Sequence, residues 1–247
     1  MITNTKENTS FTKLQFDAIY PKNIEYHYWT KVRNRIITRI VKKYGEKGGI
    51  LEIGCGRGIV VNYLNEHGLD CCGVELADVQ IPASLQDKIL ANTDVNDLPS
   101  DYCDRFTVFL LLDVIEHIAD PVSFLRNLTV RFKNLRTIVI TVPAAPELFS
   151  NYDEFNDHYR RYDWQMLKNL ATEVGIELRY QSYLFHALYW PARFTLWLHG
   201  KRKVNVTAPR NMISRGIHEI IAQMLFLDML LLPKKLKGTS LIAVYKI

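Results

Sequence analysis

A glycine-rich turn follows the first strongly apolar run of the chain, which reads I-L-E-I-G-C-G-R-G-I-V over residues 50–60. Glycines let the backbone turn tightly and approach a ligand closely. The start of a following helix offers unpaired N–H groups to an anionic group. Glu75 comes 75 − 54 = 21 residues after Gly54, where a carboxylate can accept the hydroxyls of a ribose. This spacing predicts a site for a nucleoside with an anionic tail.

Two acids and a histidine follow a second apolar run, in the stretch L-L-D-V-I-E-H that ends at His117. An imidazole titrates near neutral pH, so His117 is a candidate general base. In a second interpretation Asp113, Glu116 and His117 bind a divalent cation. In a third, His117 only caps the next helix or hydrogen-bonds to the loop.

A further polar cluster lies in D-E-F-N-D-H-Y-R-R-Y, residues 153–162. His158 is a second catalytic candidate, while Arg161 and Tyr162 are candidates for substrate binding, as is Glu116. An arginine there would hold an anionic group. The alternative is a surface loop with internal salt bridges.

Strands and helices must alternate to position these residues. Apolar runs predict strands at residues 50–53, 71–76, 89–94, 106–113, 137–142, 176–184 and 240–247. Helices are expected at residues 60–67, after the Asp120–Pro121 pair and between Asp163 and Gly175. This order predicts an α/β fold, a Rossmann-like, doubly wound, mostly parallel seven-stranded sheet.

The segments outside this alternation divide the chain further. Residues 1–10 are expected to be disordered. Residues 11–247 are interpreted as one domain, with an N-terminal helical cap (11–45), a Rossmann-like core (46–184 and 239–247) and an inserted helical lid (185–238) before the last strand.

The inserted segment contains two apolar stretches flanked by cations. Six residues at steps of four and three form one helical face: Ile213, Ile217, Ile220, Met224, Leu227 and Leu231. The favoured interpretation is a lid packed over an apolar substrate. Cations such as Lys201 and Lys235 also permit a face at a membrane surface.

The composition of the chain restricts the classes of protein to which it can belong. The 247 residues are 48% hydrophobic and carry a net charge of 31 − 26 = +5, which gives no strong sign of nucleic-acid binding. Four cysteines without metal-ligand spacing suggest free thiols in a reducing compartment. No signal peptide and no run of about 20 apolar residues is recognised. We therefore expect a cytoplasmic protein, with peripheral membrane contact left open.

Several of these motifs resemble those of a known family. E-x-G-x-G-x-G, ending at Gly58, resembles the first motif of class I S-adenosylmethionine-dependent methyltransferases, whereas Ile59 replaces the third glycine of a dinucleotide site. T-D-V-N-D-L-P (93–99) and L-L-D-V-I-E-H resemble motifs of ubiquinone-type small-molecule methyltransferases. H-Y-W-T-K-V-R (27–33), the 153–162 stretch and K-G-T-S-L-I-A-V-Y-K are similar to a bacterial subgroup.

The resemblance implies that S-adenosylmethionine is the cofactor and S-adenosylhomocysteine the product. It places Glu52 by the methionine end, Asp94 at the adenine amino group and Arg33 at the cofactor carboxylate. The cofactor-binding residues expected on this basis are Tyr28, Arg33, Glu52, Gly54, Cys55, Gly56, Gly58, Glu75, Leu76, Asp94, Val95 and Leu112. We expect no metal, because Asp113 stands where metal-associated relatives have Glu.

The expected activity is methyl transfer to a small-molecule acceptor, as O-methylation of a hydroxyl or carboxyl on an apolar or lipid-like metabolite. Two alternatives remain open: an RNA methyltransferase and a non-catalytic nucleoside-binding protein. Asp113–Glu116 lacks the [D/N/S]-P-P-[Y/F] pattern of base-amino methylation, so nucleic acid is not the expected partner. The sequence leaves the acceptor and the oligomeric state open.

Overall fold

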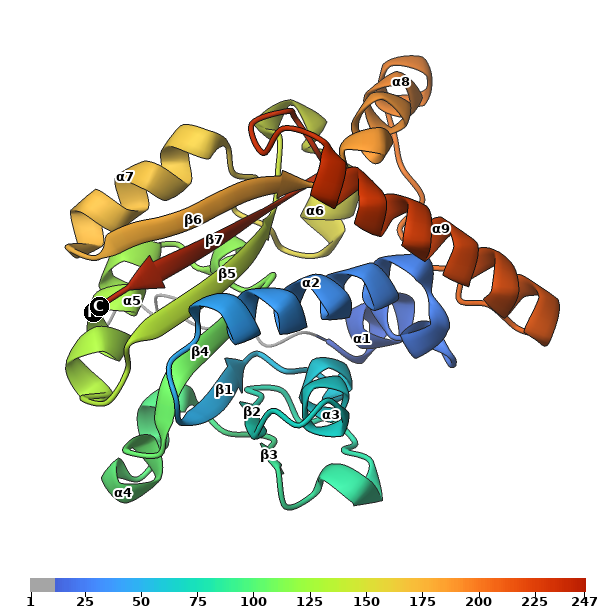
Figure 1. Cartoon of the computed structure of the whole chain (residues 1–247). Coiled ribbons are helices and arrows are strands. Elements are labelled where there is room, and N and C mark those ends of the chain that lie inside the picture. The colour runs from blue at the N-terminus through green and yellow to red at the C-terminus, as the bar shows by residue number, and fades with distance from the viewer. Residues whose placement is uncertain (1–11) are drawn as a thin grey trace, which may run out of the picture.

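The computed structural model describes residues 12–247, so the disorder expected for residues 1–10 lies outside the described part of the chain. Seven strands form one sheet in the order β3-β2-β1-β4-β5-β7-β6 (Figure 1). They are β1 (Gly49–Ile53), β2 (Cys71–Val74), β3 (Ile89–Leu90), β4 (Phe106–Leu112), β5 (Thr137–Pro143), β6 (Glu177–Leu184) and β7 (Ser240–Lys246). In this sheet β7 runs antiparallel to the other six strands. The predicted fold class is confirmed.

Helices cover both faces of this sheet. They are α1 (Lys13–Ile19), α2 (Tyr28–Tyr44), α3 (Ile59–Glu66), α4 (Ser100–Cys103), α5 (Pro121–Arg131), α6 (Asn151–Phe155), α7 (Trp164–Val174), α8 (Tyr189–His199) and α9 (Met212–Leu231). One hydrophobic core lies between the sheet and α5 and α7, and a second between the sheet and α2, α3 and α9. The molecule therefore has three layers, with α2 and α9 side by side on one face (Figure 1).

The position of the central strands in the sheet is explained by their apolar composition. β4 is an unbroken apolar run in which six of seven residues are buried, as expected for a parallel strand covered on both faces. β3 is shorter than the predicted 89–94, because the chain turns away at Asn92, which has a φ of 50°. A left-handed residue of this kind ends a strand.

The N-terminal cap is two helices rather than one continuous helical segment. Pro21 lacks a backbone N–H, and Asn23 adopts a left-handed φ of 69° between α1 and α2. His27 then accepts a hydrogen bond from the backbone N–H of Trp29 and caps α2. The break directs α1 back across the carboxyl ends of the strands, where it joins the wall of a cavity.

The inserted segment forms α8 and α9. On α9, Ala222 and Leu225 are buried against the α2 side, whereas the face predicted from residues 213–231 is exposed. The expectation that this face packs inward is therefore wrong, because α9 uses its other side for packing. None of the helices in the described part of the chain is long and apolar enough to cross a membrane.

Candidate active site

The glycine turn between β1 and α3 has the conformation that its sequence predicts. Gly54, Gly56 and Gly58 have φ values of 73°, 55° and 78°, which side chains rarely adopt. A Cβ on Gly54 would lie 2.9 Å from Val114, and one on Gly56 would lie 2.6 Å from the hydroxyl of Tyr20. The backbone here is open to a ligand because Gly54 and Gly56 have no side chains.

Glu75, just after β2, holds this turn in place. One carboxylate oxygen accepts a hydrogen bond from Gly56 N at 2.7 Å, and the other accepts from Ala77 N at 2.9 Å. Burial raises the pKa of Glu75 and these N–H donors lower it, with a net increase. Each oxygen retains a lone pair that ribose hydroxyls can use.

Glu52 lies beneath the glycine turn and is almost fully buried. Burial raises the pKa of its carboxyl to about 8, although Arg33 lowers it, and Glu75 raises it further. Its Oε2 has no hydrogen-bond partner among the described residues. A buried carboxyl of this kind fits a cofactor that brings a positively charged ammonium group.

Arg33 from α2 reaches the carboxyl end of β4. Its guanidinium forms an ion pair with Asp113 at 2.8 Å and stacks on Trp29 at 4.3 Å. Asp113 has a left-handed φ of 59° and also accepts a hydrogen bond from Thr141 at 3.4 Å. Asp113 is thus paired with Arg33, and it is not part of the group of possible metal ligands formed by Glu116, His117 and His158.

Two histidines meet on the acceptor side of the site. The rings of His117 and His158 lie edge to face, with centroids 4.7 Å apart. His158 Nδ1 is 2.9 Å from Oδ1 of Asp153, which also accepts from Arg161 Nε at 2.8 Å. Burial raises the pKa of Asp153, but the His158 and Arg161 contacts outweigh burial and lower it. Asp153 therefore orients both side chains.

His117 is a neutral imidazole at physiological pH. Burial lowers its pKa to about 4, the neighbouring His158 lowers it too, and hydrogen bonds to the backbone of Asp157 and Asn156 act in the opposite direction. The loop that carries His158 is fixed to this region because Tyr159 N donates to the carbonyl of Glu116 at 2.8 Å. The histidine pair is thus held by backbone contacts.

Glu116 lies beside this pair with both carboxyl oxygens buried and without a hydrogen-bond partner in the described residues. Burial, then the charge of Asp113, raises its pKa well above the usual range. One ligand atom each from Glu116, His117 and His158 lies within 4.8 Å of the others. This group can bind an acceptor hydroxyl or, in a different protonation state, a cation.

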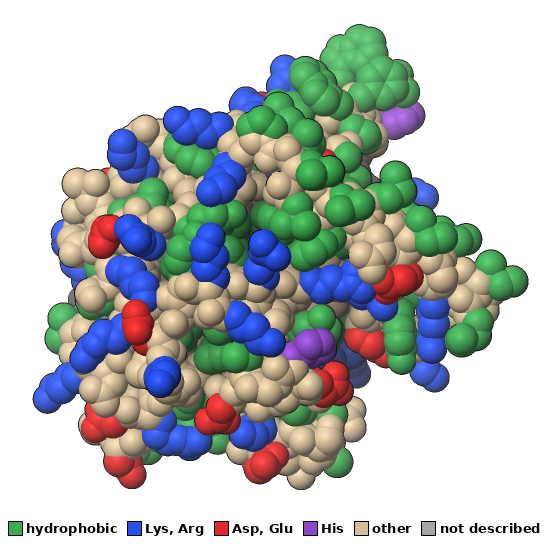
Figure 2. Space-filling view, in the orientation of Figure 1, with side chains coloured by type: hydrophobic (Ala, Val, Ile, Leu, Met, Phe, Trp, Pro, Cys, Tyr) green, Lys and Arg blue, Asp and Glu red, His purple; other side chains and the backbone are tan. Residues whose placement is uncertain are grey.

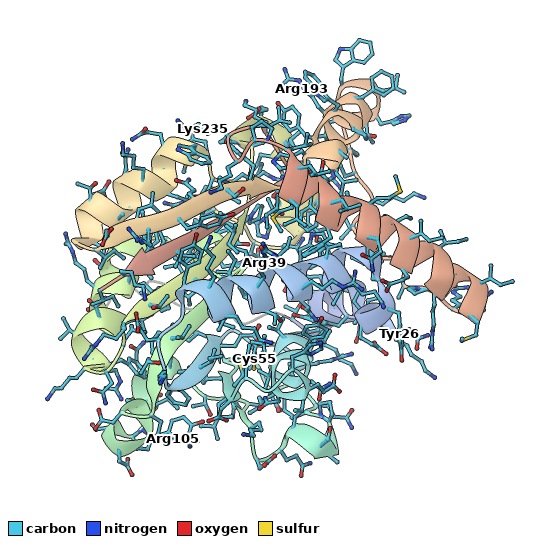
Figure 3. The ribbon with its side chains drawn as sticks, in the orientation of Figure 1. Tyr26, Arg39, Cys55, Arg105, Arg193 and Lys235 are labelled. Atoms are coloured by element: carbon cyan, nitrogen blue, oxygen red, sulfur yellow. The ribbon has the colours of Figure 1, made fainter. Side chains whose placement is uncertain are left out.

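A cavity of about 1170 Å³ connects these parts. Thirteen predicted site residues line it: Tyr28, Arg33, Gly54, Gly56, Glu75, Leu76, Asp94, Val95, Leu112, Glu116, His117, His158 and Arg161. Four others do not: Glu52, Cys55, Gly58 and Tyr162. Cys55 packs against Gly73 where β1 leads into α3 (Figure 3), and Tyr162 is buried with its hydroxyl donating to the carbonyl of Ile115. Tyr162 therefore positions the 115–117 turn.

Several lining residues were not predicted from the sequence, among them Tyr20 and Arg202. Tyr20 lies against Gly56, and burial raises its pKa far above the usual range. Arg202 enters from the segment after α8 and lies over the ring of Tyr152 at 5.4 Å. Burial, then the charge of Arg161, lowers the pKa of Arg202. Arg202 stands between Lys201 and Lys203 in the sequence, but this run of cations gave no indication that Arg202 turns inward.

Residues 25–181 match the family model described as "Methyltransferase domain". The match covers more than half of the chain, which therefore belongs to this methyltransferase family. The class I fold and the enzyme class expected from the motifs are confirmed, and S-adenosylmethionine is the cofactor.

Relatives agree with this assignment at a distance. A ubiquinone biosynthesis O-methyltransferase of Rickettsia bellii is 29% identical over 107 residues, 40% of this chain and 45% of that protein, so less than half of its length is spanned. One from Coxiella burnetii is 25% identical over 195 residues, 73% and 74% of the two chains. The solved plantazolicin methyltransferase BpumL in complex with SAH is 14% identical with a TM-score of 0.56, covering 95% of this chain and 89% of that one; this likeness concerns the fold.

Proposed function

We propose that this methyltransferase transfers a methyl group to an oxygen of a small, apolar or lipid-like acceptor beside His117 and His158. One observation carries the proposal: the glycine turn and the histidine pair line the same cavity of about 1170 Å³. Pockets for one small ligand usually have volumes of about 300–1000 Å³. This cavity has room for a nucleoside cofactor and an acceptor together.

The residues around the glycine turn hold the cofactor. In this proposal Glu75 binds the ribose hydroxyls, Asp94 and Val95 bind the adenine, and Arg33 binds the charged amino-acid end, with the buried Glu52 beneath the glycine turn acting on its ammonium group. S-adenosylmethionine, when bound, supplies a methyl group already activated by its sulfonium. The protein therefore has to orient the acceptor in line with that methyl group, which can contribute several kcal/mol, up to about 10 kcal/mol, of barrier reduction.

The Asp153–His158 pair is arranged to remove a proton from the acceptor. A carboxylate can only accept hydrogen bonds, so Nδ1 of His158 carries the proton toward Asp153 and its Nε2 is left as an acceptor. Asp153 also stabilises the imidazolium formed when Nε2 takes a proton from the acceptor hydroxyl. His117 packs against this ring and lines the same cavity. We assign it to binding the acceptor oxygen.

The lining also supports the class of acceptor. Leu188, Pro191 and Ala192 of the α8 region give the cavity an apolar wall, while Arg161 and Arg202 give it cations. An acceptor with an apolar body and an anionic or polar group near the methylated oxygen fits both features. The ubiquinone biosynthesis names of the relatives agree with an acceptor of this kind.

The proposal is tested with a matched pair of variants, His158→Gln and His117→Gln. A panel of phenolic, carboxylic and polyprenyl acceptors is screened for S-adenosylhomocysteine formation. His158→Gln should lower kcat by about 10²–10⁴-fold, with unchanged S-adenosylmethionine binding by calorimetry. His117→Gln should mainly raise KM. A variant of His158 with the parent's kcat would contradict the assignment.

The Glu116, His117 and His158 group favours a second candidate mechanism, with a divalent cation that binds the acceptor oxygen. In this mechanism Glu116, His117 and His158 would hold the cation, which would supply Lewis-acid chemistry, and the two histidines would be ligands rather than bases. Turnover in EDTA distinguishes the two. Unchanged turnover supports proton transfer to His158, whereas loss that Mg²⁺ or Zn²⁺ restores supports the cation.

A further inference from the structure

The outer faces of α8 and α9 are apolar although nothing in the described structure covers them. We propose that these two faces dock onto an anionic lipid surface, from which the acceptor enters the cavity. The second half of this statement rests on the proposed function, whereas the docking itself does not. The argument uses the polarity of α9, the aromatic residues of α8 and the distribution of charge.

Helix α9 has its polarity inverted relative to an ordinary surface helix. Its charged and ionisable side chains bind inward: Glu219 pairs with Lys31 and Arg35 of α2, both at 2.6 Å, and Asp228 accepts from the backbone N–H of His186 at 2.9 Å. Surface helices usually turn such groups to water. Here water faces the opposite side of the helix.

That opposite side is a continuous apolar stripe. Its members are all more than half exposed: Ile213, Ile217, Ile220, Met224, Leu227 and Leu231. Figure 2 shows these hydrophobic side chains along α9 at the right of the view. Contiguous apolar patches of this kind are rare on monomeric soluble proteins and mark interaction surfaces. The stripe requires an apolar environment outside the molecule.

Helix α8 presents a second apolar face with aromatic residues. Trp190, Phe194, Trp197 and Leu198 are each more than half exposed, and the helix projects from the top of the molecule (Figure 1). Tryptophan rings have an apolar body and a polar N–H, and they are enriched where hydrocarbon meets water in membranes. This face is suited to the headgroup region of a bilayer.

The charge of the chain is concentrated in the same segment. Residues 185–238 contain nine Lys and Arg and two acids, 9 − 2 = +7. The remaining chain has 22 − 24 = −2, which gives the total of +5. Arg193 lies on α8 (Figure 3), Arg202 lies in the cavity wall, and both acids of the segment, Glu219 and Asp228, are paired inward. Such a surface attracts anionic lipid headgroups.

The same charge argues against a second copy as the occupant. A symmetric dimer through this face would bring two +7 segments together, and like charges at an interface repel. Since no helix of the described residues can span a bilayer, α8 and α9 would lie in its surface. An amphipathic helix binds in this way through apolar burial and attraction to anionic lipid.

Docking would place the cavity next to the lipid. Leu188, Pro191, Ala192 and Thr195 of the α8 region line the cavity from inside, while Trp190 and Trp197 lie on the exposed face of the same helix. One short helix thus separates the cavity from the surface that we assign to lipid. An apolar acceptor dissolved in the bilayer would have a short path to the histidine pair.

The docking is tested by co-sedimentation of the full chain with phosphatidylcholine vesicles, with and without about one-third phosphatidylglycerol, at low and high salt. The variant carries Ile220→Asp and Met224→Asp together. The control is Val130→Asp, an apolar residue on α5 that is more exposed (78%) than Ile220 (63%) or Met224 (65%) and lies against the other face of the sheet. Circular dichroism melts establish that all three proteins fold.

We expect the parent and Val130→Asp to bind the anionic vesicles, and the double variant to bind at least tenfold more weakly. Weak binding to pure phosphatidylcholine and release at high salt are expected as well. Absence of parent binding at low salt, or equal binding by the double variant, would overturn the docking. So would a dimer in analytical ultracentrifugation that the double variant dissociates, because the face would then bind a second copy.

Calorimetry with S-adenosylmethionine in the absence of lipid separates this inference from the proposed function. The double variant should retain the parent's affinity, because Ile220 and Met224 lie outside the cavity lining. If the parent binds vesicles but gives no methylated product with any acceptor, the proposed function fails and the docking stands. If it methylates acceptors in solution but ignores vesicles, the reverse holds.

Discussion

Helices α2 and α9 lie side by side, and each carries an apolar stripe with helical periodicity, but only the stripe of α2 is buried. On α2 the stripe of Ile36, Ile37, Ile40 and Val41 is buried against the sheet. On α9 the stripe is exposed, while Glu219 pairs with α2, and Ala222 and Leu225 pack on the inner side. Apolar periodicity therefore identifies a face but not its direction. The direction depends on where the charged side chains find partners.

Of the substitutions that test this comparison, Ile37→Ala should lower the free energy of unfolding most. Ile37 is fully buried in the core beneath α2, so the substitution removes buried methyl groups and leaves a cavity. We expect the free energy of unfolding to fall by about 2–5 kcal/mol, measured by urea denaturation. A loss below about 1 kcal/mol would mean that α2 is not packed as described.

A second test compares a buried acid on β1, Glu52, with Glu219 on α9. The measured quantity is the pH dependence of the free energy of unfolding. Because burial raises the folded pKa of Glu52 from 4.5 to about 8, the folded state retains a proton that the unfolded chain releases. Stability should therefore fall as pH rises from about 4.5 to 8. Glu52→Gln should remove up to about 4 kcal/mol of this decline, measured as the free energy of unfolding without cofactor at pH 5 and pH 8.

Glu219 on α9 provides the control for this measurement. Hydrogen bonds from Arg35 and Lys31 lower its pKa to about 2, so its contribution is lost only as pH falls from about 4.5 toward 2. Glu219→Gln should leave the difference between pH 5 and pH 8 unchanged. A slope that persists in Glu52→Gln would show that another group titrates.

Replacing Ile220 with Ala should give the smallest effect. This side chain is exposed on α9, so the free energy of unfolding should change by no more than about 0.5 kcal/mol. Urea denaturation in the absence of lipid measures it beside Ile37→Ala. A cost like that of Ile37→Ala would mean that the α9 stripe is covered in solution, and the contrast between the two helices would disappear.

The cofactor side was largely predictable because its chemistry is local in the chain. A run of glycines after an apolar strand dictates an open turn, and Glu75 follows at the end of the next strand. The acceptor side was less predictable, because it joins distant segments. Arg202 comes from the inserted segment and His117 from the turn after β4, and no spacing in the chain indicates that both line one cavity with His158.

The amino-acid sequence by itself determined three features: the alternation of strands and helices along the chain, the glycine turn after β1, and the acid Glu75 that holds this turn. Those features depend on backbone conformation and on residues close in the chain, which local physics fixes. Only the tertiary structure decided that Arg33 pairs with Asp113, that Arg202 lines the cavity and that α9 turns its apolar side outward. These contacts depend on which buried charge finds which partner, and that requires the folded chain.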